Sequence, residues 1–215
     1  MKISVCIPCH VNDFSDLKNL ILDLNSQSRK PDEVIIFIKP VSDSFLEDKN
    51  LTLDNEIQYK FLTENKYSTM AYAKNRCIEE ATGDIICLMD SDDTLDEKKV
   101  EFVENFMKEH DRCDVMVHGY FYNDKNSVRT QSVDVQDLTY EKCLPDPNAL
   151  GIMSTSKQEL HHAHSSFRRK VLLENSFPEK DSAYRIDDSV FLKMLLKKGF
   201  NILFSKHKLI SFNKI

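Results

Sequence analysis

The sequence predicts an α/β fold in which an open, mostly parallel and twisted sheet is flanked by helices. Apolar segments of strand length alternate with segments of helical periodicity along most of the chain. The runs 34–38 and 85–89 are apolar throughout, which is typical of parallel strands buried on both faces. The chain has 215 residues, of which 41% are hydrophobic and 30% charged, as in globular proteins. We therefore expect a single domain that spans residues 1–215.

The first predicted elements alternate regularly. Residues 3–7 alternate large apolar and smaller side chains, which predicts a strand, and the periodicity of 15–27 predicts a helix. The apolar run within 33–38 predicts a second strand, and a weaker third strand is expected over 58–62. A helix is expected over 68–81, because its apolar side chains share one face.

The centre of the chain carries the most apolar strand, predicted over 85–89. Residues 94–97, Thr-Leu-Asp-Glu, have the form of a capping box, which predicts that a helix begins there. Its apolar face would be buried. Another strand is expected over 114–122, whereas 123–156 is polar and contains several breakers, so we predict irregular structure there.

The last part of the chain returns to regular structure. A helix is expected around 168–175, another over 187–198 that ends at Gly199, and a short strand over 201–204. Strands and helices in this order predict that ligands bind at the carboxyl ends of the parallel strands.

Composition and charge exclude several classes of function. Acidic residues outnumber basic ones by 35 to 29, and the resulting net charge of −6 argues against a nucleic-acid partner. The four glycines are far apart, so the chain contains no glycine-rich loop of the kind that holds phosphate groups.

The sequence shows no predicted targeting or membrane segment. Its first residues lack an apolar stretch followed by a cleavage site, and its longest apolar runs are far shorter than the ~20 residues of a membrane-spanning helix. We therefore expect a cytoplasmic protein without a transmembrane segment, whose cysteines are reduced.

The segment Cys6-Ile7-Pro8-Cys9-His10 contains patterns that occur in redox pairs and in haem-attachment sites. A redox pair needs a helix that begins at the motif, whereas Cys6 falls inside the first predicted strand. A zinc site needs a second ligand pair at a standard spacing, and the sequence has none. We interpret both cysteines as structural thiols.

The segment Asp90-Ser91-Asp92-Asp93 directly follows the most apolar predicted strand. Three carboxylates within four residues repel one another unless a cation or hydrogen-bond donors hold them. Their hard oxygen atoms would suit Mn²⁺ or Mg²⁺ that bridges to substrate phosphates. The alternative is a solvated turn whose aspartates cap the following helix.

Four segments in a fixed order resemble one enzyme family. They are residues 3–10 (Ile-Ser-Val-Cys-Ile-Pro-Cys-His), 31–36 (Pro-Asp-Glu-Val-Ile-Ile), 73–76 (Ala-Lys-Asn-Arg) and 81–93 (Ala-Thr-Gly-Asp-Ile-Ile-Cys-Leu-Met-Asp-Ser-Asp-Asp). In this order they resemble the family 2 glycosyltransferases, whose GT-A fold is a Rossmann-like open sheet flanked by helices. The resemblance covers nearly the whole chain.

The resemblance implies that residues 1–93 bind a nucleotide-sugar donor and that residues 94–215 form the acceptor side. It also implies a divalent cation, Mn²⁺ or Mg²⁺, at the acidic segment. The implied metal ligands are Asp92, Asp90 and His207. The implied donor-binding residues are Pro8, His10, Lys39, Lys74, Asn75, Asp90, Ser91 and Asp92.

The sequence departs from the family pattern at the second strand. Two aspartates are common there, one of them at the base or ribose, but this chain has Ile38 and Lys39. We therefore expect backbone and apolar contacts to hold the base in place of a side-chain carboxylate, with modest selectivity for uracil. Lys74 stands where arginine is usual and cannot make bidentate contacts. The chain has no tryptophan and so lacks the family's Q-x-x-R-W motif, which argues against a processive polysaccharide synthase.

A second acidic pair, Asp187-Asp188, lies in the part that resembles the acceptor side. The resemblance implies that Asp188 is the catalytic base and that Asp187 stands in for the neighbouring glutamate of the family. Both residues could instead simply cap the helix that is predicted to begin there. One of the three histidines His161, His162 and His164 is a further candidate for contact with the acceptor or the diphosphate, and we interpret the other two as surface or core residues.

The resemblance thus implies an inverting, metal-dependent glycosyltransferase. It would move a hexose from a nucleoside-diphosphate sugar, a UDP-sugar by analogy, to an acceptor hydroxyl of a glycan or glycoconjugate. One alternative is a sugar nucleotidyltransferase, although such enzymes usually carry a glycine-rich signature near the first strand and this chain has no glycine before Gly83. Another is a non-catalytic nucleotide- or sugar-binding module, which would explain the missing aspartates of the second strand.

Overall fold

The computed structural model describes most of the chain. The backbone is described for residues 1–46, 50–66, 68–124, 127–130, 136–138, 143–145, 153–155, 158–160, 165–179 and 187–213. Side chains are described within these ranges, except at residue 43, over 120–160 and 187–190, and at 206, 208 and 211–213.

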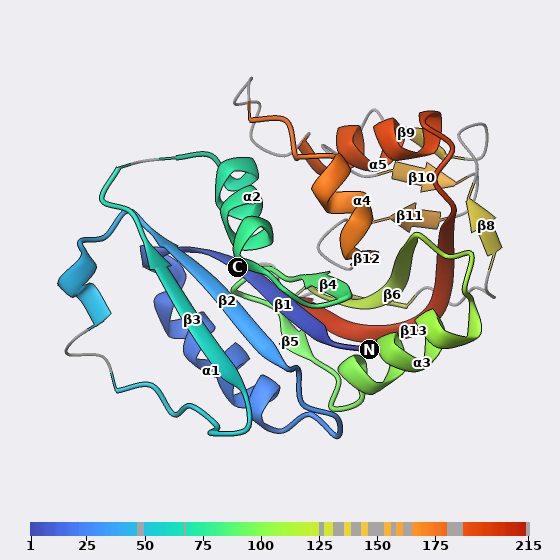
Figure 1. Ribbon diagram of the computed structural model, residues 1–215. Helices are drawn as coiled ribbons and strands as arrows, with labels where there is room; N and C mark the ends of the chain where they lie inside the picture. Colours follow the sequence, from blue (N-terminus) through green and yellow to red (C-terminus); the bar gives the residue numbers. More distant parts are fainter. Residues whose placement is uncertain are drawn as a thin grey trace.

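Helices and strands alternate from the first residues onward (Figure 1). The helices are α1 (Phe14–Asn25), α2 (Met70–Glu80), α3 (Lys99–Glu109), α4 (Arg169–Glu174) and α5 (Asp187–Lys197), with the 3₁₀ turns η1 (Val11–Asp13) and η2 (Asp43–Leu46). The strands are β1 (Ile3–His10), β2 (Glu33–Lys39), β3 (Gln58–Thr63), β4 (Ile85–Leu88), β5 (Thr94–Leu95), β6 (Val115–Asp124), β7 (Ser127–Thr130), β8 (Gln136–Leu138), β9 (Cys143–Pro145), β10 (Met153–Thr155), β11 (Gln158–Leu160), β12 (Ser165–Arg168) and β13 (Ile202–Asn213).

The main sheet has the strand order β3-β2-β1-β4-β12-β6-β13-β5, with β7 beside β6 and β8 beside β13. Neighbours within β3-β2-β1-β4 are parallel, as are β6 and β13, and β12 is antiparallel to both of its neighbours. The chain adds β2 and β3 on one side of β1 and then β4 on the other. The carboxyl ends of β1 and β4 therefore flank the topological switch point, where open α/β sheets bind ligands. Strands β9, β10 and β11 form a separate antiparallel sheet.

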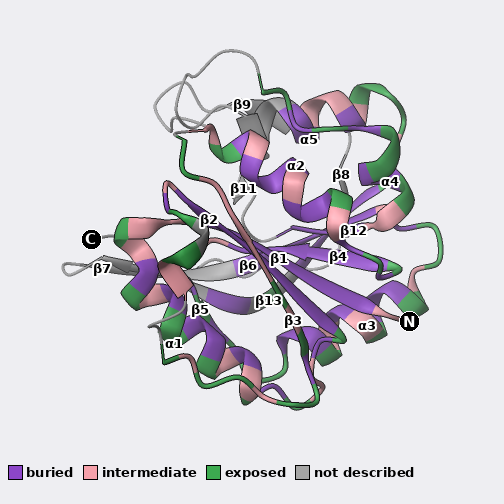
Figure 2. Cartoon of the chain, turned by 60° about the vertical axis from the view of Figure 1, so that its left-hand side comes forward, coloured by how far each residue is buried: buried purple, intermediate pink, exposed green. Residues whose placement is uncertain are grey.

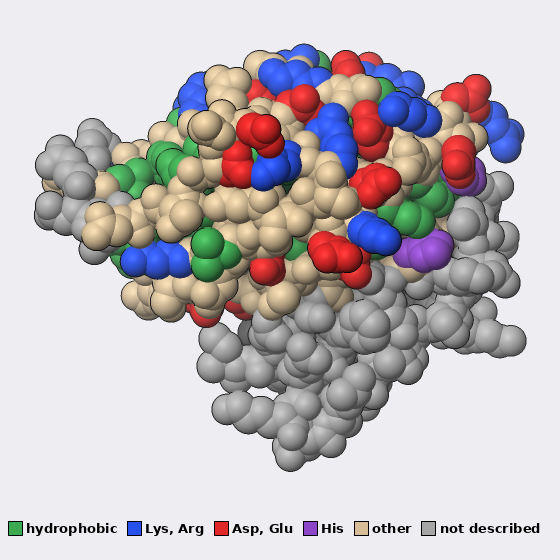
Figure 3. Space-filling model, turned by 90° about the horizontal axis from the view of Figure 1, so that it is seen from below, with side chains coloured by type: hydrophobic (Ala, Val, Ile, Leu, Met, Phe, Trp, Pro, Cys, Tyr) green, Lys and Arg blue, Asp and Glu red, His purple; other side chains and the backbone are tan. Residues whose placement is uncertain are grey.

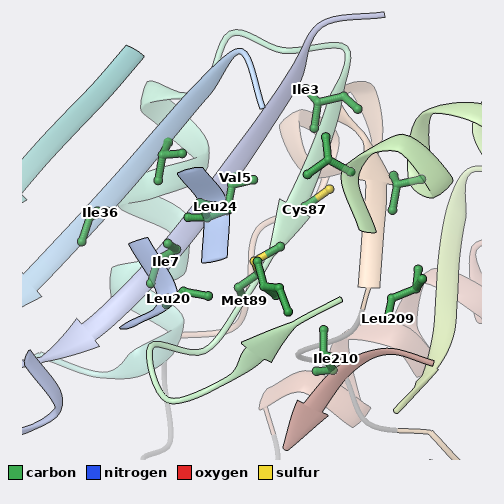
Figure 4. Close-up of a cluster of buried hydrophobic side chains, with 14 of the residues drawn as sticks. Ile3, Val5, Ile7, Leu20, Leu24, Ile36, Cys87, Met89, Leu209 and Ile210 are labelled. Carbon is green, nitrogen blue, oxygen red and sulfur yellow. The ribbon is translucent and has the colours of Figure 1, made fainter. Parts of the chain in front are cut away.

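Helices cover both faces of the main sheet, with α1 and α3 on one face and α2, α4 and α5 on the other (Figure 1). Because side chains alternate along a strand, each face has its own apolar core. Ile3, Val5 and Ile7 of β1 pack in the core of α1 and α3 (Figure 4), whereas Cys6 packs in the core of α2. The central strands are buried throughout (Figure 2). The predicted mostly parallel sheet between two layers of helices is confirmed.

The elements predicted before residue 90 are all present, and their ends differ from the prediction by only a few residues. The N-terminal cap of α2 is Thr69, whose hydroxyl accepts a hydrogen bond from the Tyr72 N–H (3.1 Å). In the second half, α4 and α5 also lie where helices are predicted. Gly199 follows α5 with a φ of +84°, a conformation that glycine adopts without strain.

The predicted helix start at residues 94–97 is wrong. The first two of these residues form β5, which pairs with β13, and α3 begins only at Lys99. The Leu95 N–H donates a hydrogen bond to the Asp23 carboxylate of α1 (3.0 Å). Tertiary contacts thus take the place of the predicted capping box. The apolar face predicted for this helix is buried, as seen at Val100, Val103 and Met107.

Three further differences lie in the second half of the chain. Residues 123–156, predicted to be irregular, contain the short strands β7 to β10. Strand β12 has the sequence Ser-Ser-Phe-Arg, which is too short and polar to predict a strand. β13 extends to Asn213, well beyond the predicted strand 201–204, through two register shifts against β6. The residues at these shifts interrupt the apolar alternation, so the sequence pattern stops early.

Lysine and arginine side chains are intermixed with aspartate and glutamate over the described part of the face that Figure 3 shows. Within the described ranges, no helix is both long enough and apolar enough to cross a membrane.

Candidate active site

The ends of β1 and β4 meet at the switch point of the sheet. β1 ends at His10, and β4 ends at Leu88 and leads directly into Asp90–Asp93, which we call the acidic turn. The Met89 N–H donates to the Cys6 carbonyl (3.1 Å) and carries the pairing of the two strands up to the turn. The fold therefore holds the acidic turn at the edge where a ligand would bind.

The acidic turn is closed by hydrogen bonds between its first and last residues. The Asp90 N–H donates to Oδ2 of Asp93 (3.3 Å), and the Asp93 N–H donates to the Asp90 carbonyl (3.3 Å). The other carboxylate oxygen of Asp93, Oδ1, is buried and has no hydrogen-bond partner among the described residues. Such an oxygen is costly to bury, which indicates that the turn is built to receive a further group.

Crowding changes the proton affinity of these carboxylates. Burial, followed by the negative charge of Asp90, raises the pKa of Asp92 to about 6. Burial and Asp90 also raise the pKa of Asp93 well above its usual range, although the positive charge of Lys99 acts in the opposite direction. Burial and mutual repulsion thus make the ionised forms of these carboxylates costly.

Two aspartates that the sequence analysis does not single out contribute to this charge. Asp13 ends η1 and Asp16 lies in the first turn of α1, and both help to raise the pKa of Asp92. Burial, opposed by His10, raises the pKa of Asp13 itself. Their position directly after β1 is the signal in the sequence, because the segment that follows β1 opens at the same edge as the segment that follows β4.

A buried lysine compensates part of this charge from the protein interior. Lys99, the first residue of α3, is 1% exposed, and its Nζ has no hydrogen-bond partner among the described residues. Burial lowers its pKa to about 8, although the charges of Asp93 and Asp90 act to raise it. Burial and the charge of Lys99 also lower the pKa of His118 well below its usual range.

The acidic turn fits a hard divalent cation. Mg²⁺ and Mn²⁺ prefer carboxylate oxygens and are commonly held by one or two carboxylates together with substrate phosphates. Within the described ranges, no three His, Cys, Asp or Glu side chains form a ready metal site. The exposed ring of His207 packs on Phe102 of α3, with centroids 4.3 Å apart, and is not grouped with Asp90 and Asp92.

The predicted donor-binding residues beside the turn are fixed by local contacts. Pro8 is buried within β1, and the half-buried His10 accepts a hydrogen bond at Nδ1 from the backbone N–H two residues later (3.2 Å). The buried Ser91 hydroxyl forms a hydrogen bond with the Cys9 thiol. Burial raises the pKa of Cys9 to about 12 and that of Cys6 well above its usual range. Both thiols are therefore unreactive parts of β1, in agreement with their interpretation as structural.

Two predicted donor-binding lysines lie at the same edge of the sheet. Lys39 ends β2, is 2% exposed, and donates a hydrogen bond to the Ser68 carbonyl. Burial lowers its pKa to about 8, while the charge of Glu64 acts to raise it. Lys74 of α2 is also buried, and its Nζ lies 5.2 Å from the centroid of the Phe177 ring. Their positive charges repel each other enough to lower the pKa of Lys39 further.

Asn75 has a structural role that its motif does not reveal. Its amide donates to the Phe177 carbonyl (2.9 Å) and to Oε1 of Glu179 (2.7 Å), and its Oδ1 accepts from the Phe177 N–H (2.9 Å). Both N–H groups of the amide are thus occupied. Asn75 connects α2, on the donor side, with the segment that follows α4.

The predicted catalytic pair forms the first residues of α5. The backbone of α5 is described from Asp187, whereas the side chains of Asp187 and Asp188 lie outside the described residues. α5 is held by the ring of Phe191, which stacks on Phe177 with centroids 4.0 Å apart. Also outside the described residues are His161, His162 and His164.

The sequence matches the family model described as Glycosyl transferase family 2 over residues 4–174. The match runs from β1 to the end of α4 and includes the acidic turn. No curated protein gives a significant match to the chain.

Solved structures of similar fold include two complexes of S. aureus TarS, residues 1–349. The complex with UDP has a TM-score of 0.73 at 20% identity and covers 100% of this chain and 61% of that chain. The complex with UDP-GlcNAc has a TM-score of 0.70 at 20% identity and covers 100% and 59%. The mannosyltransferase PcManGT from Pyrobaculum calidifontis, in complex with GDP-Man and Mn²⁺, has a TM-score of 0.65 at 13% identity and covers 98% and 56%. At these identities the likeness shows the fold alone, and the chain spans less than two thirds of each of these proteins.

Proposed function

This chain belongs to glycosyl transferase family 2 and has the GT-A fold, and from this premise we propose that it is a metal-dependent, inverting hexosyltransferase. Its donor would be a nucleoside-diphosphate sugar, a UDP-sugar, and its acceptor a hydroxyl of a glycan or glycoconjugate. The observation that carries the proposal is the acidic turn at the switch point, where crowded carboxylates have raised pKa values.

On the donor side, Asp90 and Asp92 would hold Mn²⁺ or Mg²⁺ against the diphosphate. Such an ion, when bound, neutralises the charge that develops on the leaving group. Lys39 and Lys74 would add positive charge at the same edge. His207, whose ring packs on Phe102, stays a third candidate ligand.

On the acceptor side, Asp188 would take the proton of the acceptor hydroxyl while that oxygen attacks the anomeric carbon. A single displacement inverts the anomeric configuration and needs no nucleophile from the protein. The dipole of α5 would lower the pKa of a carboxylate at its N-terminus, and the negative charge of Asp187 would oppose that effect.

The ligands of the structural neighbours support the proposed donor class. TarS is solved with UDP and with UDP-GlcNAc, and PcManGT with GDP-Man and Mn²⁺. These proteins share the fold of this chain, and each is solved with a nucleotide or a nucleotide sugar.

Calorimetric titration of UDP with and without Mn²⁺ tests the proposal. We expect much tighter binding with Mn²⁺, because the cation would offset repulsion between the diphosphate and the acidic turn. At a free UDP concentration of ~100 times Kd, binding should raise the free energy of unfolding by about 2.7 kcal/mol. Asp92→Asn should abolish the effect of Mn²⁺.

The matched control is Glu97→Gln, which removes one negative charge from an exposed position just beyond the turn. It should leave the effect of Mn²⁺ on UDP affinity unchanged. Equal UDP affinity with and without Mn²⁺ in the unmodified protein would contradict metal dependence.

A further inference from the structure

The ring of Phe177 lies where α2 and α5 meet the segment that follows α4. Phe177 is 2% exposed and belongs to the apolar core that these helices cover. Its ring stacks on Phe191 of α5, with centroids 4.0 Å apart and ring planes at 25°. The ammonium nitrogen of Lys74 in α2 lies over the same ring, 5.2 Å from its centroid. One side chain thus contacts both a predicted donor-binding residue and the helix that begins with the predicted catalytic pair.

Hydrogen bonds to α2 fix the backbone of Phe177. The Phe177 N–H donates to Oδ1 of Asn75 (2.9 Å), and the Phe177 carbonyl accepts from the Asn75 amide (2.9 Å). Asn75 directly follows Lys74 in α2. The backbone of Phe177 therefore cannot move away from Lys74 unless buried hydrogen bonds are broken, which is costly.

The Phe177 ring attracts the Lys74 ammonium to its face. An aromatic ring carries negative charge density on its faces, and an ammonium group within about 6 Å of the ring centroid is attracted to it. The attraction is stronger where water is excluded. Lys74 is 3% exposed, so little water competes with the ring for its ammonium. Phe177 therefore holds this group at a defined place.

The charge of Lys74 lies near the edge of the sheet that carries the acidic turn. It acts on Lys39, the last residue of β2, and helps to lower the pKa of that residue. β2 is parallel to β1, so the carboxyl ends of both strands share this edge. Under the proposed function, the diphosphate of the donor would bind at the same edge.

A lysine at such a place gains from external support. Its side chain is flexible and loses conformational freedom when a ligand fixes it, which weakens binding. Arginine presents a rigid, planar group to phosphate, whereas lysine presents a single charge on a flexible stem. A lysine whose ammonium is already held by a ring loses less freedom when it meets a phosphate group.

We propose that Phe177 is a positioning residue for the donor, whose ring holds the ammonium of Lys74 where the diphosphate binds. The proposal rests on the proposed function, because it takes Lys74 as a donor-binding residue. An ammonium group has three N–H donors, so it can interact with the ring and donate to phosphate oxygens at the same time. The stack on Phe191 connects the same ring to α5.

Calorimetric titration of UDP in the presence of Mn²⁺ tests the proposal in Phe177→Leu, in Lys74→Met and in the double variant. Phe177→Leu should weaken UDP binding about 3- to 30-fold, the range expected for loss of a cation–π contact. Lys74→Met, which keeps an unbranched stem without the charge, should weaken it at least as much. In the Lys74→Met background, Phe177→Leu should change UDP affinity by less than about 2-fold, because no ammonium is left to position.

The matched control is Phe167→Leu. Phe167 of β12 is 1% exposed and also packs on Phe191, with centroids 6.1 Å apart. Loss of its ring disturbs the same core and should leave UDP affinity within about 2-fold of the unmodified protein.

A second variant separates attraction from packing. Phe177→pentafluorophenylalanine nearly keeps the shape of the ring but reverses the charge distribution on its faces. The fold should persist, and UDP binding should weaken when Lys74 is present but not in the Lys74→Met background. This variant decides the question if Phe177→Leu does not fold.

Several results would overturn the assignment of Phe177 while UDP still binds in the presence of Mn²⁺. They are equal losses from Phe177→Leu in both backgrounds, an equal loss in Phe167→Leu, and unchanged UDP affinity in Lys74→Met or in the fluorinated variant. If the unmodified protein does not bind UDP with Mn²⁺, the proposed function fails and the assignment fails with it.

Discussion

Asp92 connects the proposed function to the stability of the chain through its raised pKa. Burial and the charge of Asp90 raise this pKa to about 6, above the value of about 3.9 expected in the unfolded chain. The folded state therefore binds the proton more tightly, and folding loses stability as the pH rises from about 4 to above 6. The ionised form, which a cation needs, is the form that the fold tolerates least.

Asp92→Asn should therefore stabilise the metal-free protein at neutral pH. We expect a gain of about 1–3 kcal/mol in the free energy of unfolding at pH 7.5. The gain should shrink towards zero near pH 4, where the carboxyl is protonated in both states. Chemical denaturation at several pH values measures it, with Glu97→Gln as the control. A variant that is less stable than the unmodified protein at pH 7.5 would contradict the raised pKa.

Asp188→Asn tests the proposed base. Asparagine keeps the shape and capping ability of aspartate but cannot take a proton, so the fold should persist. Transfer should fall by the ~10²–10⁴-fold that is typical of a lost acid–base group, with donor affinity nearly unchanged. Steady-state kinetics and donor titration measure the two effects separately.

Asp187→Asn is the matched control for this experiment and should reduce transfer less than Asp188→Asn. A larger loss of transfer in Asp187→Asn than in Asp188→Asn would show that Asp187 is the base. If neither variant changes turnover, the base lies elsewhere and His164 becomes the next candidate.

At the scale of elements, Asn75 joins α2 to the segment between α4 and α5. Asn75→Ala would leave the Phe177 N–H and carbonyl without their partners in a buried place. We expect the free energy of unfolding to fall by about 2–4 kcal/mol. Asn19→Ala, on the exposed face of α1, should change stability by only a few tenths of a kcal/mol. Denaturant unfolding of both variants measures the difference, and a loss of UDP binding at unchanged stability would instead indicate direct donor contact.

The elements that the sequence predicts well are those whose own side chains decide their structure. β2 and β4 contain apolar runs buried on both faces, β1 alternates large apolar and smaller side chains, and α1 and α3 have an apolar stripe. Local pattern and packing therefore agree in these elements. Residues 94–97 have the sequence pattern of a helix start. The first two of them instead form β5, because they pair with β13. β12 is a strand because it pairs with β4 on one side and β6 on the other. The local sequence of Ser165–Arg168 does not predict this pairing.

Some parts of the candidate site can likewise be predicted from local sequence, whereas others depend on tertiary contacts. The acidic turn is predictable because its residues are adjacent in sequence and follow an apolar strand. The contributions of Asp13 and Lys99 depend on how separate loops meet at one edge, which the sequence order alone does not show. The bonds of Asn75 to a segment more than a hundred residues away likewise arise only in the folded chain.

At the scale of the whole molecule, Glu104 of α3 links the two halves of the chain. Its carboxylate pairs with the amino group of Met1 (3.1 Å), with Nε of Arg29 (3.3 Å) and with Nζ of Lys108 (3.2 Å). Burial acts to raise its pKa, but these hydrogen bonds and charges outweigh burial and lower the pKa to about 2. Stability from this group is therefore present above about pH 4.5 and is lost as the pH falls towards 2.

Glu104→Gln should lower the free energy of unfolding at pH 7 by about 1–3 kcal/mol. The difference from the unmodified protein should narrow as the pH falls from 4.5 towards 2. Glu109→Gln, an exposed change at the end of the same helix, should be close to neutral. Denaturant unfolding at pH 7 and pH 3 measures both variants, and an equal loss at the two pH values would rule out the lowered pKa.

The place of β12 in the sheet has a consequence for folding during synthesis on the ribosome. β1, β2, β3 and β4 can pair as soon as they leave the ribosome, but the other edge of β4 waits for Ser165–Arg168. At about 5–20 residues per second, translation leaves that edge open for several seconds. An unpaired apolar strand edge is a template for aggregation. We therefore expect a ribosome that stalls before β12 to release a product prone to aggregate.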